Sequence, residues 1–147
     1  MSTQVLFITP PFTQLNTPYP ATAYLKGFLN TLGASSKQAD LGIEVMLAIL
    51  SKPGLTRIFE QAEKSTSLSD NSLRILRLRA QYLQTISPII DFLQDKNPTL
   101  AYSIAEGEFL PQAGRFDQVE ELDWAFGALG IRDKARYLAT LYLEDLG

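Results

Sequence analysis

Neutral hydrogen-bonding side chains gather in a proline-bounded stretch near the start of the 147-residue sequence. Between Pro10 and Pro20 the chain offers hydroxyl, amide and phenol groups, and no lysine or arginine, at Thr13, Gln14, Asn16, Thr17 and Tyr19. Because such groups bond without carrying charge, the stretch suits amides and hydroxyls better than bare phosphate. It lacks the glycine patterns of dinucleotide-binding and P-loop sites. The alternative interpretation is that the prolines only fix a turn and the polar side chains face water.

The elements on either side of this stretch predict where it lies. The uninterrupted apolar run from Val5 to Ile8 predicts a strand buried on both faces, and the prolines after it end the sheet ladder. Thr17 and Pro18 predict the start of a helix that runs to Leu32, with Gly33 as its C-cap. Ligands of open α/β sheets bind at the carboxyl ends of the strands. We therefore expect a cofactor or substrate to contact Pro11, Phe12, Thr13, Asn16, Thr17 and Tyr19.

A second candidate position follows the next predicted strand. This strand, Ser36 to Ala39, ends at Asp40. In doubly wound folds an acidic residue at this place can bind a ribose hydroxyl, so Asp40 joins the candidate cofactor-binding residues. The Leu41-Gly42 pair that follows leaves a second interpretation, in which Asp40 caps the next helix.

Helical spacing of apolar residues dominates the rest of the sequence. The run from Ile43 to Leu50 is apolar on almost every side and predicts a helix buried between layers. The polar stretch 65–71 is the expected boundary between a first part, residues 1–64, and a helical part, residues 65–147, packed together as one compact unit. A long helix is expected to start at Ser69 or Asp70 and to bend or split near Ser87, because Pro88 removes a hydrogen bond. Further helices are expected at Leu55 to Ala62, Thr99 to Glu106, Gln118 to Leu129 and Asp133 to Leu146.

Composition removes several classes of chemistry. The chain has no histidine and no cysteine, so the commonest general base and the thiol nucleophile are missing, and we predict no catalytic residue and no metal site. Four acids between Asp117 and Asp123 suit the start of a helix better than a metal, because the helix dipole favours negative charge there. The basic patch formed by Arg74, Arg77 and Arg79 is expected to pair with local acids, with a phosphate or an acidic partner as the alternative.

Charge and hydropathy point to a cytoplasmic protein. A net charge of −3 argues against a nucleic-acid partner. No apolar segment approaches the length of about 18 residues that a membrane span needs, and the start lacks the basic region of a signal peptide. The glycine at position 147 stands where a helix cap would, which indicates a fragment of a longer protein.

The stretch ITPPFTQLNTPYPATAYLKGFLNTLG, followed by QADLGIE, resembles the amino-terminal end of radical S-adenosylmethionine proteins that carry a cobalamin-binding-like domain. The resemblance covers Val5 to Glu44. It implies a part that contributes to a cofactor or substrate cleft and is not catalytic alone. It also implies S-adenosylmethionine and an iron–sulfur cluster in the parent enzyme, and leaves cobalamin open. The family's three-cysteine motif and axial histidine have no counterpart here, so we expect no cofactor to bind tightly to this chain alone.

These patterns predict a helix-rich α/β fold. It starts with a two-stranded parallel β-α-β unit, a partial doubly wound or Rossmann-like fold, and continues as a multi-helix segment. The expected partner is the remainder of the parent protein, and the open edge of the first strand predicts self-association, most simply as a homodimer, when the chain is isolated. The alternative function is a non-catalytic helical module that binds a partner protein through an apolar groove.

Overall fold

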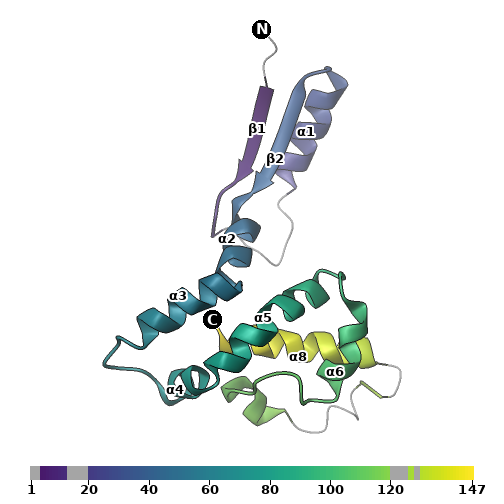
Figure 1. The fold of residues 1–147 in the computed structure, drawn as a ribbon. Helices are drawn as coiled ribbons and strands as arrows, with labels where there is room; N and C mark the ends of the chain where they lie inside the picture. The colour runs from purple at the N-terminus through teal and green to yellow at the C-terminus, as the bar shows by residue number, and fades with distance from the viewer. Residues whose placement is uncertain (1–3, 13–19, 120–125, 128–129) are drawn as a thin grey trace. The chain divides into compact units, whose positions relative to one another are not determined.

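A computed structural model describes residues 4–12, 20–119, 126–127 and 130–147. The chain is a helix-rich α/β protein with a two-stranded parallel sheet in a β-α-β start, as the sequence predicts (Figure 1). It divides into two compact units, Met1–Ile49 and Leu50–Gly147, which we call the strand unit and the helical unit. This boundary lies before the predicted one at residues 64 and 65, because the helix Lys52–Ala62 packs within the helical unit.

The strand unit is built from β1 (Gln4–Thr9), α1 (Ala21–Thr31), β2 (Ser35–Asp40) and α2 (Leu41–Ile49). The two strands pair in parallel, with a register that runs from Gln4 opposite Ser35 to Thr9 opposite Asp40. Gly33 ends α1 as predicted: its φ of +69° is the left-handed conformation that glycine adopts without strain. The N–H of Ala34 then donates to the carbonyl of Leu29 at 3.0 Å, which closes the helix end.

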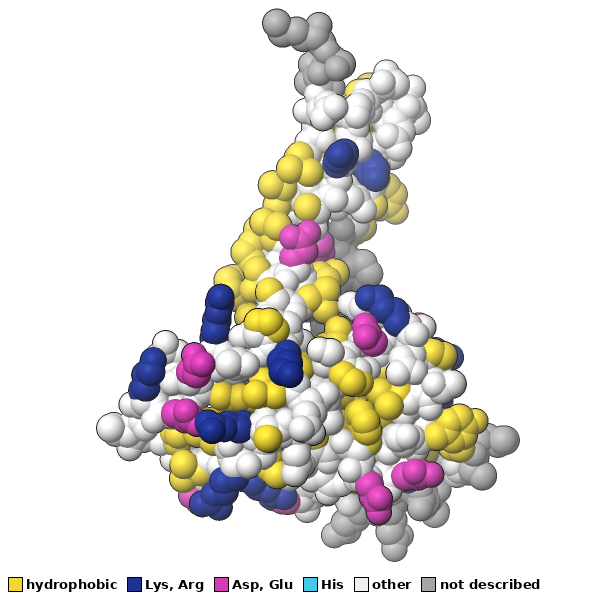
Figure 2. Space-filling view, viewed as in Figure 1, with side chains coloured by type: hydrophobic (Ala, Val, Ile, Leu, Met, Phe, Trp, Pro, Cys, Tyr) yellow, Lys and Arg dark blue, Asp and Glu magenta, His cyan; other side chains and the backbone are white. Residues whose placement is uncertain are grey.

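The predicted burial of β1 on both faces is wrong. Its residues alternate instead, with Leu6 58% and Ile8 50% exposed and Val5 and Phe7 half-buried. The helix α2 is not buried between layers either, since Ile43 is 52% exposed. Both predictions assumed covering layers that the described residues of the strand unit do not supply. Figure 2 shows hydrophobic atoms gathered along this unit. We call the set the apolar surface of the strand unit: Leu6, Ile8, Tyr24, Leu25, Phe28, Leu32, Ile43 and Leu47.

The helical unit has a continuous core. Its elements are α3 (Lys52–Ala62), α4 (Asp70–Arg77), α5 (Arg79–Leu93), η1 (Pro98–Leu100), α6 (Ala101–Ala105), η2 (Gly114–Gln118) and α8 (Ile131–Asp145). The rings of Tyr82 and Tyr142 stack between α5 and α8 with centroids 5.0 Å apart, and the Phe59 ring meets Tyr82 edge-on at 6.4 Å. The largest fully buried side chains around them are Leu55, Ile86, Ile89, Phe92 and Ile104.

The long helix breaks at Leu78 and not at Pro88. Ser69 caps its first part, α4, by accepting the N–H of Ser72 at 3.1 Å, which confirms the predicted start. Leu78 then leaves the helical conformation, with φ −90° and ψ 2°. Pro88 lies inside α5, where Ile86 and Ile89 are 0% exposed. We attribute the continuity of α5 there to this packing, which offsets the hydrogen bond that proline removes.

The helices that the sequence predicts after residue 98 are confirmed in part. The predicted helices at 99–106 and 133–146 are present, as η1 with α6 and as α8. Most of the predicted helix 118–129 lies outside the described residues, and Asp117 lies within η2. No helix in the described part of the chain is long and apolar enough to cross a membrane.

Candidate functional site

The predicted ligand-binding stretch is described only at its two ends. Thr13, Asn16, Thr17 and Tyr19 lie outside the described residues. Pro11 and Phe12 form a turn directly after β1, and Phe12 is 87% exposed with a left-handed φ of 64°. The parallel register brings this end of β1 level with Asp40 at the end of β2. A role for the stretch in ligand binding therefore stays a prediction.

Asp40 is the N-cap of α2. Its Oδ1 accepts the backbone N–H of Ile43 at 3.1 Å, which supplies one of the hydrogen bonds that the first turn of a helix lacks. This confirms the second interpretation of the residue. Among the described residues no hydrogen bond is formed by Oδ2, so capping occupies only one of the two carboxylate oxygens.

Replacing the cap gives a direct measure of this role. Asp40→Ala should lower the free energy of unfolding by about 1 kcal/mol, because the N–H of Ile43 loses its acceptor. Asp40→Asn should cost only a fraction of that, since the asparagine oxygen caps helices as well as aspartate does. Urea denaturation of both variants checks the prediction, and equal losses would contradict it.

The helical unit contains a pocket of about 380 Å³ that the sequence did not point to. Its volume lies in the range of small-molecule sites. We call it the helical pocket. The apolar part of its wall comes from α3, α4 and the segment between them, at Leu55, Ile58, Phe59, Ala62, Leu68, Ile75 and Leu76. The polar part comes from α4, η2 and α8, at Asn71, Ser72, Arg115, Glu144 and Asp145.

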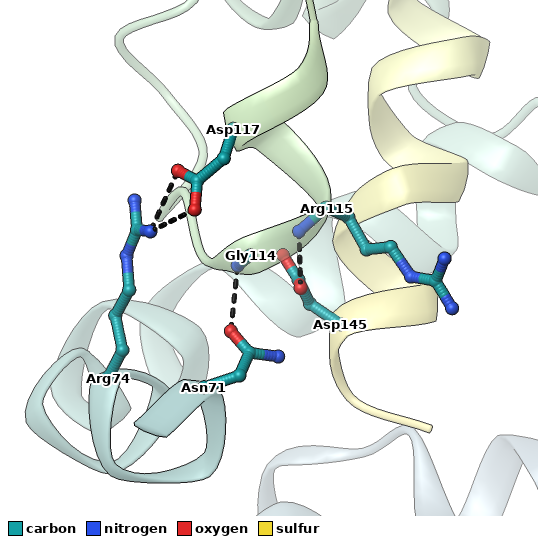
Figure 3. A network of polar contacts seen from close by, with 6 residues as sticks. All are labelled: Asn71, Arg74, Gly114, Arg115, Asp117 and Asp145. Atoms are coloured by element: carbon teal, nitrogen blue, oxygen red, sulfur yellow. Dashed lines mark hydrogen bonds and ion pairs between the residues drawn. The ribbon is translucent and has the colours of Figure 1, made fainter. Parts of the chain in front are cut away.

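Side chains of α4 and α8 hold η2 at the edge of this pocket (Figure 3). Asn71 Oδ1 accepts the N–H of Gly114 at 2.7 Å, and Asp145 Oδ1 accepts the next N–H, that of Arg115, at 2.9 Å. A Cβ on Gly114 would lie 2.7 Å from Asn71 Oδ1, so glycine permits this close approach. Arg74 also binds both carboxylate oxygens of Asp117 at 2.8 Å. The polar side of the pocket is thus fixed by contacts between distant parts of the sequence.

Two arginines of the basic patch pair with acidic side chains, as the first interpretation of the patch predicts. Arg74 pairs with Asp117, and Arg79 pairs with Glu63. All four side chains are between 41% and 59% exposed, so each pair contributes little to stability. Within the described residues Arg77 has no ion pair.

Asp145 is the unusual residue of the helical pocket. It is 6% exposed, and its Oδ2 is buried with no hydrogen-bond partner among the described residues. The hydroxyl of Tyr82 is also buried, and it too has no hydrogen-bond partner among the described residues. Burial raises the pKa of Tyr82, and the negative charge of Asp145 raises this pKa further, so the carboxylate acts electrostatically on the core.

The sequence did hold a signal for Asp145. Leu138, Tyr142 and Asp145 recur at the spacing of one helix face, and α8 buries all three. An acidic residue in register with core positions predicts a buried carboxylate.

Neither clusters of metal-binding side chains among the described residues nor comparisons with known proteins indicate a further site. In the described ranges no group of three or more acidic, histidine or cysteine side chains is placed to hold a metal ion. No protein-family model, characterised protein or solved structure matches the chain.

Proposed function

We propose that this chain is the amino-terminal, cobalamin-binding-like part of a radical S-adenosylmethionine protein, where it forms one side of a cofactor or substrate cleft. The observation that carries the proposal is the parallel pairing of β1 and β2 in a β-α-β unit with Pro11, Phe12 and Asp40 at the carboxyl ends of the strands. Ligands of open α/β sheets bind at that end. The likeness of Val5 to Glu44 to such proteins adds to this support.

The apolar surface of the strand unit supports the remainder of a parent protein as the partner. Two strands alone make a marginal sheet, because a sheet needs more strands or helical cover to be stable. Here one face of β1 and parts of α1 and α2 expose large apolar side chains. Further strands and helices of the parent protein would bury them.

The chain lacks the residue types that would hold the cofactors of the proposed parent enzyme. Without cysteine or histidine it cannot supply the thiolates of an iron–sulfur cluster or an axial imidazole, so its residues do not fit these groups. In this proposal the chain binds and orients a ligand through neutral groups and through Oδ2 of Asp40, to which no described residue donates a hydrogen bond. We place the protein in the cytoplasm, without a membrane or nucleic-acid partner, and we do not regard this chain as catalytic alone.

The reading frame beyond codon 147 provides the first test. We expect an in-frame CxxxCxxC motif, and the encoded protein, purified without oxygen and supplied with iron and sulfide, should show cluster absorbance and bind S-adenosylmethionine. A stop codon directly after codon 147 would instead favour the alternative, a non-catalytic helical module that binds a partner protein. The apolar wall of the helical pocket is the observation that favours this alternative.

Self-association of the isolated chain is a further expected result. The strand β1, reading QVLFIT, carries no charge, and an uncharged apolar edge is a template for pairing with another copy. Light scattering coupled to size exclusion should give a mass above the 16.3 kDa of one chain, rising with concentration. Leu6→Lys should restore the monomer, and since Leu6 is 58% exposed the change need not disturb a core.

The matched control for that experiment is Tyr102→Lys, which places a charge on an apolar side chain of the helical unit that is 63% exposed. It should leave the association unchanged. A single monomeric mass for the unmodified chain at all concentrations would show that the edge of β1 does not pair.

A further inference from the structure

We infer that the helical pocket binds an organic cation, a small apolar body that carries one protonated amine, and that the amine bonds to the buried carboxylate of Asp145. This site is independent of the proposed function, because all of its lining residues belong to the helical unit.

One oxygen of the buried Asp145 carboxylate has no hydrogen-bond donor among the described residues. A buried carboxylate oxygen without a hydrogen-bond donor is costly, and natural proteins keep few of them. Oδ1 accepts the N–H of Arg115, but no described residue donates to Oδ2, although Asp145 lines a pocket open to ligands. An ammonium group supplies the missing donor and the compensating charge together, and such charge-assisted bonds are the strong ones.

The charges around the pocket select a cation. Among the described residues of its wall, the one basic side chain is that of Arg115, whose Nε lies 3.8 Å from Glu144 Oε2. That guanidinium is thus paired at the surface, and Asp145 receives only the backbone N–H of the same residue. The described part of the wall therefore holds two carboxylates against one guanidinium, which disfavours an anionic ligand.

The apolar residues of the pocket wall favour a ligand with a hydrocarbon chain. Leu55 is 1%, Phe59 5% and Ile75 9% exposed, so the apolar surface they present to the pocket is part of the fixed core. A chain of several carbon atoms would bury apolar area against them, and binding should strengthen about fourfold for each methylene added. A linear alkylammonium ion is therefore a suitable probe.

The experiment compares three probes of one length on the full chain. Hexylammonium, hexanol and hexanoate are titrated at neutral pH and followed by calorimetry. We expect saturable binding of hexylammonium, weaker binding of hexanol and no binding of hexanoate. Butylammonium should bind more weakly than hexylammonium.

Two variants locate the site, and a third is the control. Asp145→Asn keeps an oxygen for the Arg115 N–H but removes the charge, and should weaken hexylammonium binding about tenfold or more while leaving hexanol nearly unchanged. Asp133→Asn makes the same chemical change at an exposed position of α8 and should leave binding unchanged. Ala62→Phe fills the apolar part of the pocket and should weaken binding of both the amine and the alcohol.

Circular dichroism of each variant shows whether it is folded. Equal binding of hexylammonium to the unmodified protein and to folded Asp145→Asn would overturn the inference. So would tighter binding of hexanoate than of hexylammonium, or the absence of any saturable binding of hexylammonium to the unmodified protein.

Discussion

The helical unit is expected to unfold as the pH rises from about 10 to about 12. Tyr142 is 0% exposed, and burial raises its pKa from 10.0 to about 12. Burial, the charge of Asp145 and the neighbouring Tyr142 also raise the pKa of Tyr82. Because each folded-state pKa lies above the unfolded one, this stability is complete below pH 10 and is lost as the pH rises through the folded values.

The expected loss is large compared with total stability. For Tyr142 the change from 10.0 to about 12 corresponds to roughly 3 kcal/mol of the free energy of unfolding. Tyr82 adds a loss in the same direction. Since small proteins are stable by only about 5–15 kcal/mol, ionisation of the two stacked tyrosines should suffice to unfold the unit.

The measurement follows tyrosinate absorbance and far-ultraviolet circular dichroism together during an alkaline titration. Absorbance of the buried tyrosines and loss of helix should coincide. Tyr142→Phe and Tyr82→Phe should each move the transition to higher pH, while Tyr102→Phe, at a side chain that is 63% exposed, should not. Helix content that stays constant while all six tyrosines ionise would contradict the prediction.

Elements marked by local signals could be predicted from the sequence. Pro10-Pro11 ends β1, Gly33 caps α1 and Ser69 caps α4, because each of these residues acts on the backbone within a few positions of itself. The parallel β-α-β start followed from the same signals. Asp40 belongs to this group too, since its capping interpretation depended only on the residues after it.

Features that depend on distant residues were missed. The apolar run of β1 indicated burial, but burial needs a covering layer, and a sequence of apolar residues does not show whether that layer exists. Pro88 indicated a bend or a split, and the split is absent, since the packing of Ile86 and Ile89 outweighs one lost hydrogen bond. The helical pocket was missed because Asn71 and Asp145 meet η2 from segments far apart in the chain.

Removing the side chain of Ile86 should lower the stability of the helical unit more than any single change at the surface. Ile86 is 0% exposed in the middle of α5, inside the cluster that holds Tyr82 and Tyr142. Ile86→Ala deletes buried carbon atoms and leaves a cavity among closely packed neighbours, which costs about 2–5 kcal/mol. Relative to a typical total of about 5–15 kcal/mol, that loss should move the urea midpoint strongly downward.

The control for this variant is Ile43→Ala in α2, which makes the same chemical change at a side chain that is 52% exposed. It should cost well under half as much, because little buried area is lost and no closed cavity forms. Urea unfolding followed by circular dichroism measures both. Similar losses for the two variants would mean that α2 is covered in solution, which would place a partner or a second copy on the apolar surface of the strand unit, where the parent protein is proposed to dock.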